Sequence, residues 1–212
     1  MNSFDFDTLR VQIREAARLA FGALRAQHPD ETFYAMALYT DDGAMTVCTS
    51  ANSEEAFQRI LLGDDFSDPA SVAATRWFTA EWAYESVHSE HFDVPCERLR
   101  KHVLTLDDDA PAADAKSFAA PARRLLAHVL KLGKNDSFGV FRSKLHDTMV
   151  QALAELDQEG FFGTGSQRQA LTLFCSISDS DEAEAFEDRS AKQLNPPAVF
   201  AAFEKRWDVS SA

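Results

Sequence analysis

The chain has 212 residues, of which 45% are apolar and 26% are charged, so it can bury a sizeable core and is not expected to be disordered. Asp and Glu outnumber Lys and Arg by 34 to 21, and the formal net charge of −13 disfavours binding to a nucleic-acid phosphate backbone. No apolar run approaches the roughly 18 residues of a membrane span. The N-terminus lacks the features of a signal peptide, and three cysteines do not make a disulfide framework. We therefore expect a cytoplasmic protein without membrane contact.

A helix and a β-hairpin are predicted in the first part of the chain. Residues 5–27 carry apolar side chains three and four positions apart, as the buried face of a helix does. Residues 32–40 are aromatic-rich and roughly alternating, which favours a strand, and Asp41-Asp42-Gly43 is typical of a hairpin turn. The returning strand is expected at 44–49, and residues 53–63 have the end signals of a short helix.

Helices dominate the prediction for the rest of the chain, with one further strand. Residues 169–177 form the most strand-like run of the second half. The stretch 107–114 is acidic and rich in proline and alanine, which predicts a flexible loop. Apolar spacing and end signals predict the remaining helices at 89–104, 119–132, 145–156, 182–193 and 198–207.

These elements predict an α+β fold. Neither half of the chain has enough strands for a sheet of its own, so residues 1–212 are expected to form one domain. The late strand would join the early hairpin in a small, mainly antiparallel sheet covered by helices, with the helix at 5–27 packed on one face.

The acidity of the chain is concentrated in one segment. Residues 29–97 contain 14 acidic and 2 basic residues. The acids can serve solubility alone, or they can form a surface that meets a basic partner. Trp and Tyr often carry binding energy at interfaces, although they also fill corners of a core. The candidate partner-binding residues are Asp41, Asp42, Asp64, Asp65, Trp77, Glu81, Trp82 and Tyr84.

Candidates for catalysis or metal binding are weak. His88, His91 and Cys96 come closest to a metal site, but their spacing matches no standard zinc pattern. Cys48 and Cys175 lie in predicted apolar strands, where a cysteine is usually a small buried hydrophobe. No Walker lysine, dinucleotide-binding glycine pattern or Gly-x-Ser-x-Gly motif is present, so we expect no cofactor.

Several short motifs, taken in order, resemble a known family. They are Phe33-Tyr34-Ala-Met-Ala-Leu-Tyr39-Thr40-Asp41, Arg76-Trp77, Glu81-Trp82-Ala-Tyr84, Gly160-Phe161-Phe162-Gly163 and Leu194-Asn195-Pro196. From about residue 5 to 205 the chain resembles the family called domain of unknown function 4303. The resemblance implies a bacterial, cytosolic protein with no established activity and no catalytic residues to carry over. Members of the family are similar in size and character to proteins encoded beside polymorphic toxins, and this association implies an immunity role.

Two classes of function remain open at this stage. The first is a binding protein, most concretely an immunity-type inhibitor that caps a basic toxin domain through the acidic segment and its aromatic residues. The second is an enzyme with an unrecognised site near His88, His91 and Cys96. A housekeeping domain without a toxin partner is a third possibility.

Overall fold

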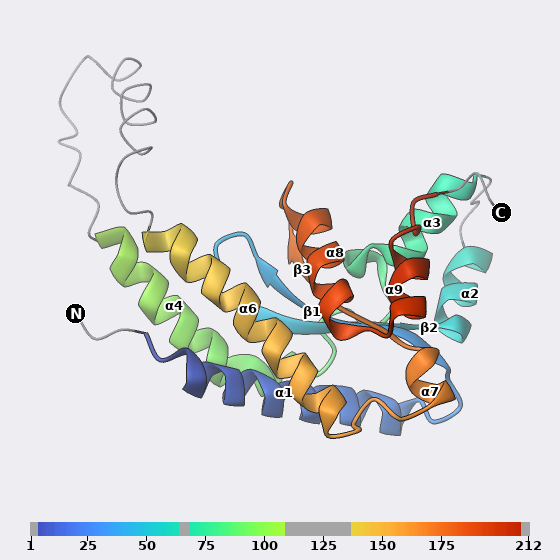
Figure 1. Ribbon diagram of the computed structural model, residues 1–212, viewed down its shortest axis with the longest axis horizontal. Coiled ribbons are helices and arrows are strands. Elements are labelled where there is room, and N and C mark those ends of the chain that lie inside the picture. The colour runs from blue at the N-terminus through green and yellow to red at the C-terminus, as the bar shows by residue number, and fades with distance from the viewer. Residues whose placement is uncertain (1–3, 64–67, 109–136, 209–212) are drawn as a thin grey trace, which may run out of the picture.

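In the computed structural model, which describes residues 4–63, 68–108 and 137–208, helices lie on both faces of a three-stranded sheet (Figure 1). The first part contains α1 (Phe6–Gln27), β1 (Phe33–Asp41), β2 (Val47–Ser53) and α2 (Glu54–Gly63). The second contains α3 (Pro69–Trp77), η1 (Thr79–Glu81), η2 (Ser89–Phe92) and α4 (Asp93–Asp108). The third contains α6 (Ser137–Gln158), α7 (Ser166–Gln169), β3 (Thr172–Ser178), α8 (Ala183–Leu194) and α9 (Pro197–Phe203). The predicted α+β class is confirmed.

The sheet has the order β2-β1-β3, so the late strand joins the early hairpin as predicted. Strand β1 pairs with β2 in antiparallel fashion, with Leu38 opposite Thr49. Strand β3 pairs with β1 in parallel, with Cys175 opposite Leu38. The sheet is therefore mixed rather than mainly antiparallel. Parallel pairing needs a long connection between the two strands. Here the chain passes through α4 and α6 before β3 begins, and the first residue of β3 then lies opposite Ala35, near the start of β1.

The hairpin turn is longer than predicted. The carboxylate of Asp41 accepts hydrogen bonds from the backbone N–H groups of Met45 and Thr46, at 3.0 and 2.6 Å, which holds these residues in the loop. The returning strand consequently begins at Val47 and ends at Ser53, later than the predicted 44–49. A Cβ atom at Gly43 would lie 2.7 Å from the Asp41 carboxylate, so a larger residue there would require this carboxylate to move.

Each face of the sheet has its own hydrophobic core. On one face α1 and α6 cover Met36 and Leu38 of β1, as predicted for the helix at 5–27. On the other face Phe174 of β3 packs with Trp82 and with Phe203 of α9. Strand β1 lies between the two cores, which is why its sequence is apolar almost throughout.

Side chains from α8 and its end cover the outer edge of β3. The amide of Asn195 donates to the carbonyl of Leu173 at 2.6 Å and accepts from its N–H at 2.9 Å. The Ser190 hydroxyl accepts from the N–H of Cys175 at 2.9 Å. A strand edge that is satisfied in this way cannot pair with another strand.

Two predictions for the middle of the chain fall partly or wholly outside the described residues. The helix expected at 119–132 lies outside them. Helix α4 continues to Asp108, so the first two residues of the predicted loop 107–114 are helical, and the rest of that stretch is not described.

A buried histidine in α6 should make stability depend on pH. His146 is 5% exposed and stacks on Phe186, with ring centroids 4.3 Å apart. Burial, reinforced by the charges of Arg142 and Arg189 and opposed by Asp42, lowers the pKa of His146 from 6.5 to about 4. The unfolded chain therefore takes up this proton first as the pH falls, and the folded state loses about 3 kcal/mol between pH 6.5 and 4.

Urea unfolding at pH 7 and pH 4 measures this effect against a His146→Gln variant, whose side chain does not titrate. The native chain should lose about 3 kcal/mol more than the variant over this interval. Equal losses in the two proteins would contradict the assignment to His146.

Candidate functional site

A groove of about 970 Å³ lies at the carboxyl ends of the parallel strands β1 and β3. Tyr39 of β1 and Ser178 of β3 line it, together with η1 on one side and the start of α8 on the other. Ligand sites often lie outside the carboxyl ends of parallel strands. Six carboxylates line this acidic groove, namely those of Glu81, Glu85, Asp179, Asp181, Glu184 and Glu187.

Most of this negative charge is unpaired. Within the described residues, five of the six carboxylates have no ion-pair partner, Glu187 being the exception, and no lysine or arginine lines the groove. Two acidic residues nearby are paired, because the Arg142 guanidinium lies 2.9 Å from the carboxylates of both Asp42 and Glu182. The five unpaired carboxylates belong to exposed residues, so the groove presents an uncompensated negative field to solvent.

Glu187 is the buried carboxylate of the groove, and its contacts connect the groove to the segment after α9. Its carboxylate accepts a hydrogen bond from the Ser176 hydroxyl at 2.6 Å and lies 3.3 Å from the Arg206 guanidinium. Burial raises the pKa of Glu187, although Ser176 and Arg206 act to lower it. A buried ion pair thus joins α8 to the residues after α9.

Two aromatic residues stand at the rim of the groove. Phe78 is 51% exposed, and its ring centroid lies 5.1 Å from that of Trp207. Both residues line the groove beside the carboxylates. Acids around an aromatic pair form a surface suited to lysine or arginine side chains, which are attracted both by the charges and by the ring faces.

Two potential nucleophiles at the groove, the Tyr39 hydroxyl and the nearby Cys48 thiol, are not activated in the described part of the chain. The Tyr39 hydroxyl is hydrogen-bonded to Ser86 and to Glu85, and burial raises the pKa of Tyr39. Burial also raises the pKa of the neighbouring Cys48 to about 11. The Cys48 thiol therefore stays protonated at neutral pH, whereas a catalytic cysteine needs a lowered pKa.

The predicted acidic residues are not all gathered in this groove. Glu81 lines it. Asp41 uses its carboxylate to hold the hairpin turn, and Asp42 is paired with Arg142. Asp64 and Asp65 lie outside the described residues, so their part in a partner-binding surface stays a prediction.

The predicted aromatic contacts are mostly interior. Trp82 and Tyr84 are buried and Trp77 is half-buried. The Trp82 indole donates to the carbonyl of Arg76 at 3.0 Å, and the Tyr84 hydroxyl donates to Glu31 at 2.6 Å. Trp82 and Tyr84 are therefore structural residues and do not supply an exposed contact surface.

The structure does not assemble the weak metal or catalytic candidates. The rings of His88 and His91 lie 6.3 Å apart, but the buried Cys96 thiol is engaged with the backbone of Val47. Among the described residues, no three or more His, Cys, Asp or Glu side chains converge to hold a metal ion. Burial also raises the pKa of Cys96, which does not favour a nucleophile there.

Sequence reasoning missed part of the groove. Asp179, Asp181 and Glu184 come from the last third of the chain, where neighbouring acids in a turn are typical of a solvated loop. The parallel pairing of β3 with β1 brings them beside Glu81 and Glu85. The acidity of the segment after β3 was the signal that the sequence offered. Only the direction of β3 in the sheet shows that this segment lies beside Glu81 and Glu85.

None of the helices in the described ranges is long and apolar enough to cross a membrane.

Comparison with known proteins supports the family resemblance. No curated protein and no solved structure matches the chain. The model of one family, described as a domain of unknown function (DUF4303), matches residues 13–196. Because this match covers most of the chain, the protein belongs to the DUF4303 family.

Proposed function

We propose that this chain is a binding protein that captures a basic protein through the acidic groove, most concretely as an immunity-type inhibitor of a toxin domain. The observation that carries the proposal is the convergence of five unpaired carboxylates around one groove with Phe78 and Trp207 at its rim. In this proposal Phe78 and Trp207 supply the aromatic part of the contact, in place of the buried Trp82 and Tyr84.

The groove supports both steps of such a capture. Its unpaired carboxylates attract a basic surface over several ångströms and so raise the association rate. Once a lysine or arginine side chain enters, the carboxylates pair with it, and the exposed Phe78 ring offers a cation–π contact. The aromatic pair then slows dissociation, because desolvated aromatic contacts commonly dominate the free energy of binding at an interface.

Charge reversal in the groove tests this proposal. The combined change Glu81→Lys and Asp181→Lys should lower the association rate with a fluorescent lysine-rich nonapeptide about tenfold at low salt. The native rate should also fall steeply as salt rises, because the Debye length shrinks from about 10 Å at 0.1 M to about 3 Å at 1 M. Stopped-flow fluorescence measures both rates.

A matched pair of changes separates the groove from the net charge. Asp7→Lys with Asp30→Lys alters the net charge by the same amount at exposed residues, and Asp30 precedes the opposite end of β1. This control should change the association rate less than about threefold. The Glu81/Asp181 pair should leave unfolding within about 0.5 kcal/mol of native, and the control should cost about 1 kcal/mol, because Asp7 lies in the first turn of α1 and pairs with Arg10. If both pairs slow association equally, the acidity acts only through net charge and the groove is not the contact.

The immunity role needs its own test. The neighbouring genes are read first, and the absence of a toxin gene among them would contradict the immunity role. Where a toxin domain is encoded there, the chain is co-expressed with it and growth is recorded. Native protein and the Asp7/Asp30 control should protect the cells, and the Glu81/Asp181 variant should not. Equal protection by the Glu81/Asp181 variant would show that inhibition does not use the acidic groove.

A further inference from the structure

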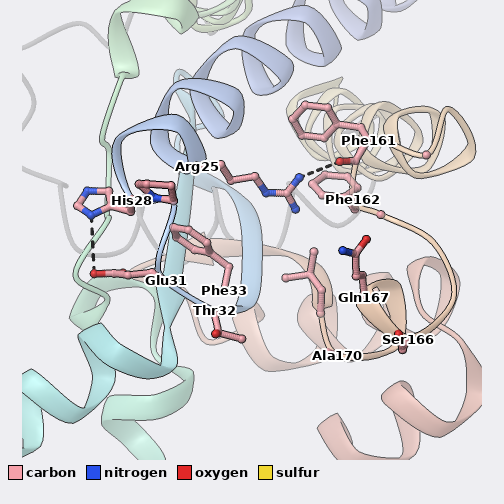
Figure 2. Close-up of a pocket in the computed structure, with 14 residues that line it drawn as sticks. Arg25, His28, Glu31, Thr32, Phe33, Phe161, Phe162, Ser166, Gln167 and Ala170 are labelled. Atoms are coloured by element: carbon pink, nitrogen blue, oxygen red, sulfur yellow. Dashed lines mark hydrogen bonds and ion pairs between the residues drawn. The ribbon is translucent and has the colours of Figure 1, made fainter.

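A second cavity lies at the other end of β1 and differs in character from the acidic groove. It has a volume of about 630 Å³, within the range of small-molecule sites. The end of α1, the start of β1, the turn after α6 and helix α7 surround it (Figure 2). Exposed Ser166 and Gln167 form part of its lining, so the cavity opens to solvent.

The positive charge in this cavity belongs to Arg25. Its guanidinium donates one hydrogen bond, to the carbonyl of Phe161 at 2.8 Å, and lies 5.3 and 5.7 Å from the ring centroids of Phe161 and Phe162. No carboxylate within the described residues pairs with it. Burial lowers the pKa of Arg25, but an arginine stays protonated at neutral pH. One of its five N–H donors has a hydrogen-bond partner among the described residues, which leaves others to meet a ligand.

Arg25 differs from the other arginines of α1, which have carboxylate partners. Arg10, Arg14 and Arg18 each form an ion pair with Glu155 or Glu159 at the end of α6. Arg25 lies two turns further along the helix and reaches into the cavity instead (Figure 2). A partly buried guanidinium whose one hydrogen-bond partner among the described residues is a carbonyl is a ready site for an anion.

The one carboxylate in the lining does not neutralise Arg25. Glu31 accepts hydrogen bonds from the hydroxyls of Ser53 and Tyr84 and pairs with Arg59 at 2.8 Å. Burial acts to raise the pKa of Glu31, but these contacts together lower it. Glu31 is therefore ionised and already satisfied, and its charge is offset by Arg59.

The walls of the cavity define the rest of the ligand. Phe33, Phe161, Phe162 and Leu171 present apolar surface, whereas Thr32, Ser166 and Gln167 add polar groups near the opening. One guanidinium matches the two oxygens of a single carboxylate, and a doubly charged phosphate would need more positive charge than this lining supplies, since Arg25 is its one lysine or arginine among the described residues. We propose that the cavity binds a small organic carboxylate, with Arg25 holding the carboxylate and the phenylalanine rings holding an apolar body.

Solution NMR on the full chain tests this site with benzoate, phenylacetate and hexanoate as probes. At least one probe should give saturable shifts at the amides of Gly160, Gly163 and Gln167, with a dissociation constant of about 1 mM, as expected for so small a ligand. The neutral analogue phenylacetamide should bind at least about tenfold more weakly than phenylacetate, because it cannot form the charge-assisted pair.

Variants locate the charge. Arg25→Met keeps an apolar stem and should weaken binding about tenfold or more. Arg25→Lys keeps the charge without the two-pronged geometry and should fall between native and Arg25→Met. The matched control Arg10→Met removes an arginine of the same helix that pairs with Glu155 and should bind as native.

Three results would overturn the proposal. The first is no saturable shift from any of the carboxylates. The second is equal affinity of the native chain and Arg25→Met while both give folded spectra. The third is tighter binding of inorganic phosphate than of every carboxylate, which would assign a different ligand to Arg25. None of these results bears on the acidic groove, so this site and the proposed function are tested separately.

Discussion

Replacing Trp82 with alanine should lower the free energy of unfolding by about 3–5 kcal/mol. Trp82 is 3% exposed and packs between Tyr34 of β1 and Phe174 of β3, with ring centroids 6.3 and 5.6 Å away. The change would leave a large cavity and remove the hydrogen bond to the carbonyl of Arg76. Urea or thermal unfolding followed by circular dichroism measures the loss.

Phe78→Ala is the matched control for this prediction. Phe78 is also aromatic and lies four residues earlier in the chain, but it stands at the rim of the acidic groove. Its removal should cost less than about 1 kcal/mol, because an exposed ring has little packing to lose. If Trp82→Ala costs as little as Phe78→Ala, then Trp82 is not part of the core.

Arg206→Met should also destabilise the fold by about 3–5 kcal/mol, for an electrostatic reason. The Arg206 side chain is 1% exposed and pairs with Glu187 and Asp188 of α8. Without it, the buried Glu187 carboxylate keeps only its hydrogen bond from Ser176. An uncompensated buried charge costs far more than a surface ion pair contributes.

A second change shows whether charge is the cause. Glu187→Gln combined with Arg206→Met removes both charges and should recover most of the lost stability. Lys101→Met serves as the surface control, because Lys101 is 74% exposed and pairs with Glu97 on the same helix, and it should cost less than about 0.5 kcal/mol. An equal loss in the single Arg206 variant and in the double variant would assign the effect to lost packing instead.

The Glu187–Arg206 pair also connects stability to the proposed function. Glu187 lines the acidic groove, and Arg206 lies beside Trp207 at its rim, with the guanidinium 5.2 Å from that ring. Loss of the pair should therefore loosen the rim as well as the fold. For this reason the charge reversals that test binding are placed at exposed residues, where stability is preserved.

Local patterns in the sequence predicted most of the described elements. The apolar spacing of residues 5–27 corresponds to α1, and the aromatic run at 32–40 corresponds to β1 within one residue at each end. Such patterns are reliable because helix and strand periodicities follow directly from backbone geometry. The start of β2 was misplaced, since the Asp41 carboxylate lengthens the turn by contacts that no propensity scale includes.

The aromatic cluster shows where sequence reasoning stops. From the sequence alone, Trp77, Trp82 and Tyr84 are compatible both with an interface and with a core. The structure places Trp82 and Tyr84 inside, where the carbonyl of Arg76 in α3 and the carboxylate of Glu31 satisfy their polar atoms. It leaves Phe78 at the surface, although nothing in its own sequence context distinguishes it.

The sequence by itself determined the fold class, the acidity, the principal helices and strands and the family, because these depend on composition, periodicity and short motifs. The tertiary structure decided the direction of β3, and with it the site. Parallel pairing brings the carboxyl ends of β1 and β3 to one edge, so that acids about a hundred residues apart in the chain line one groove. Among the described residues, the tertiary structure also leaves Arg25 without the carboxylate partner that Arg14 and Arg18 have, because α6 ends before it reaches Arg25.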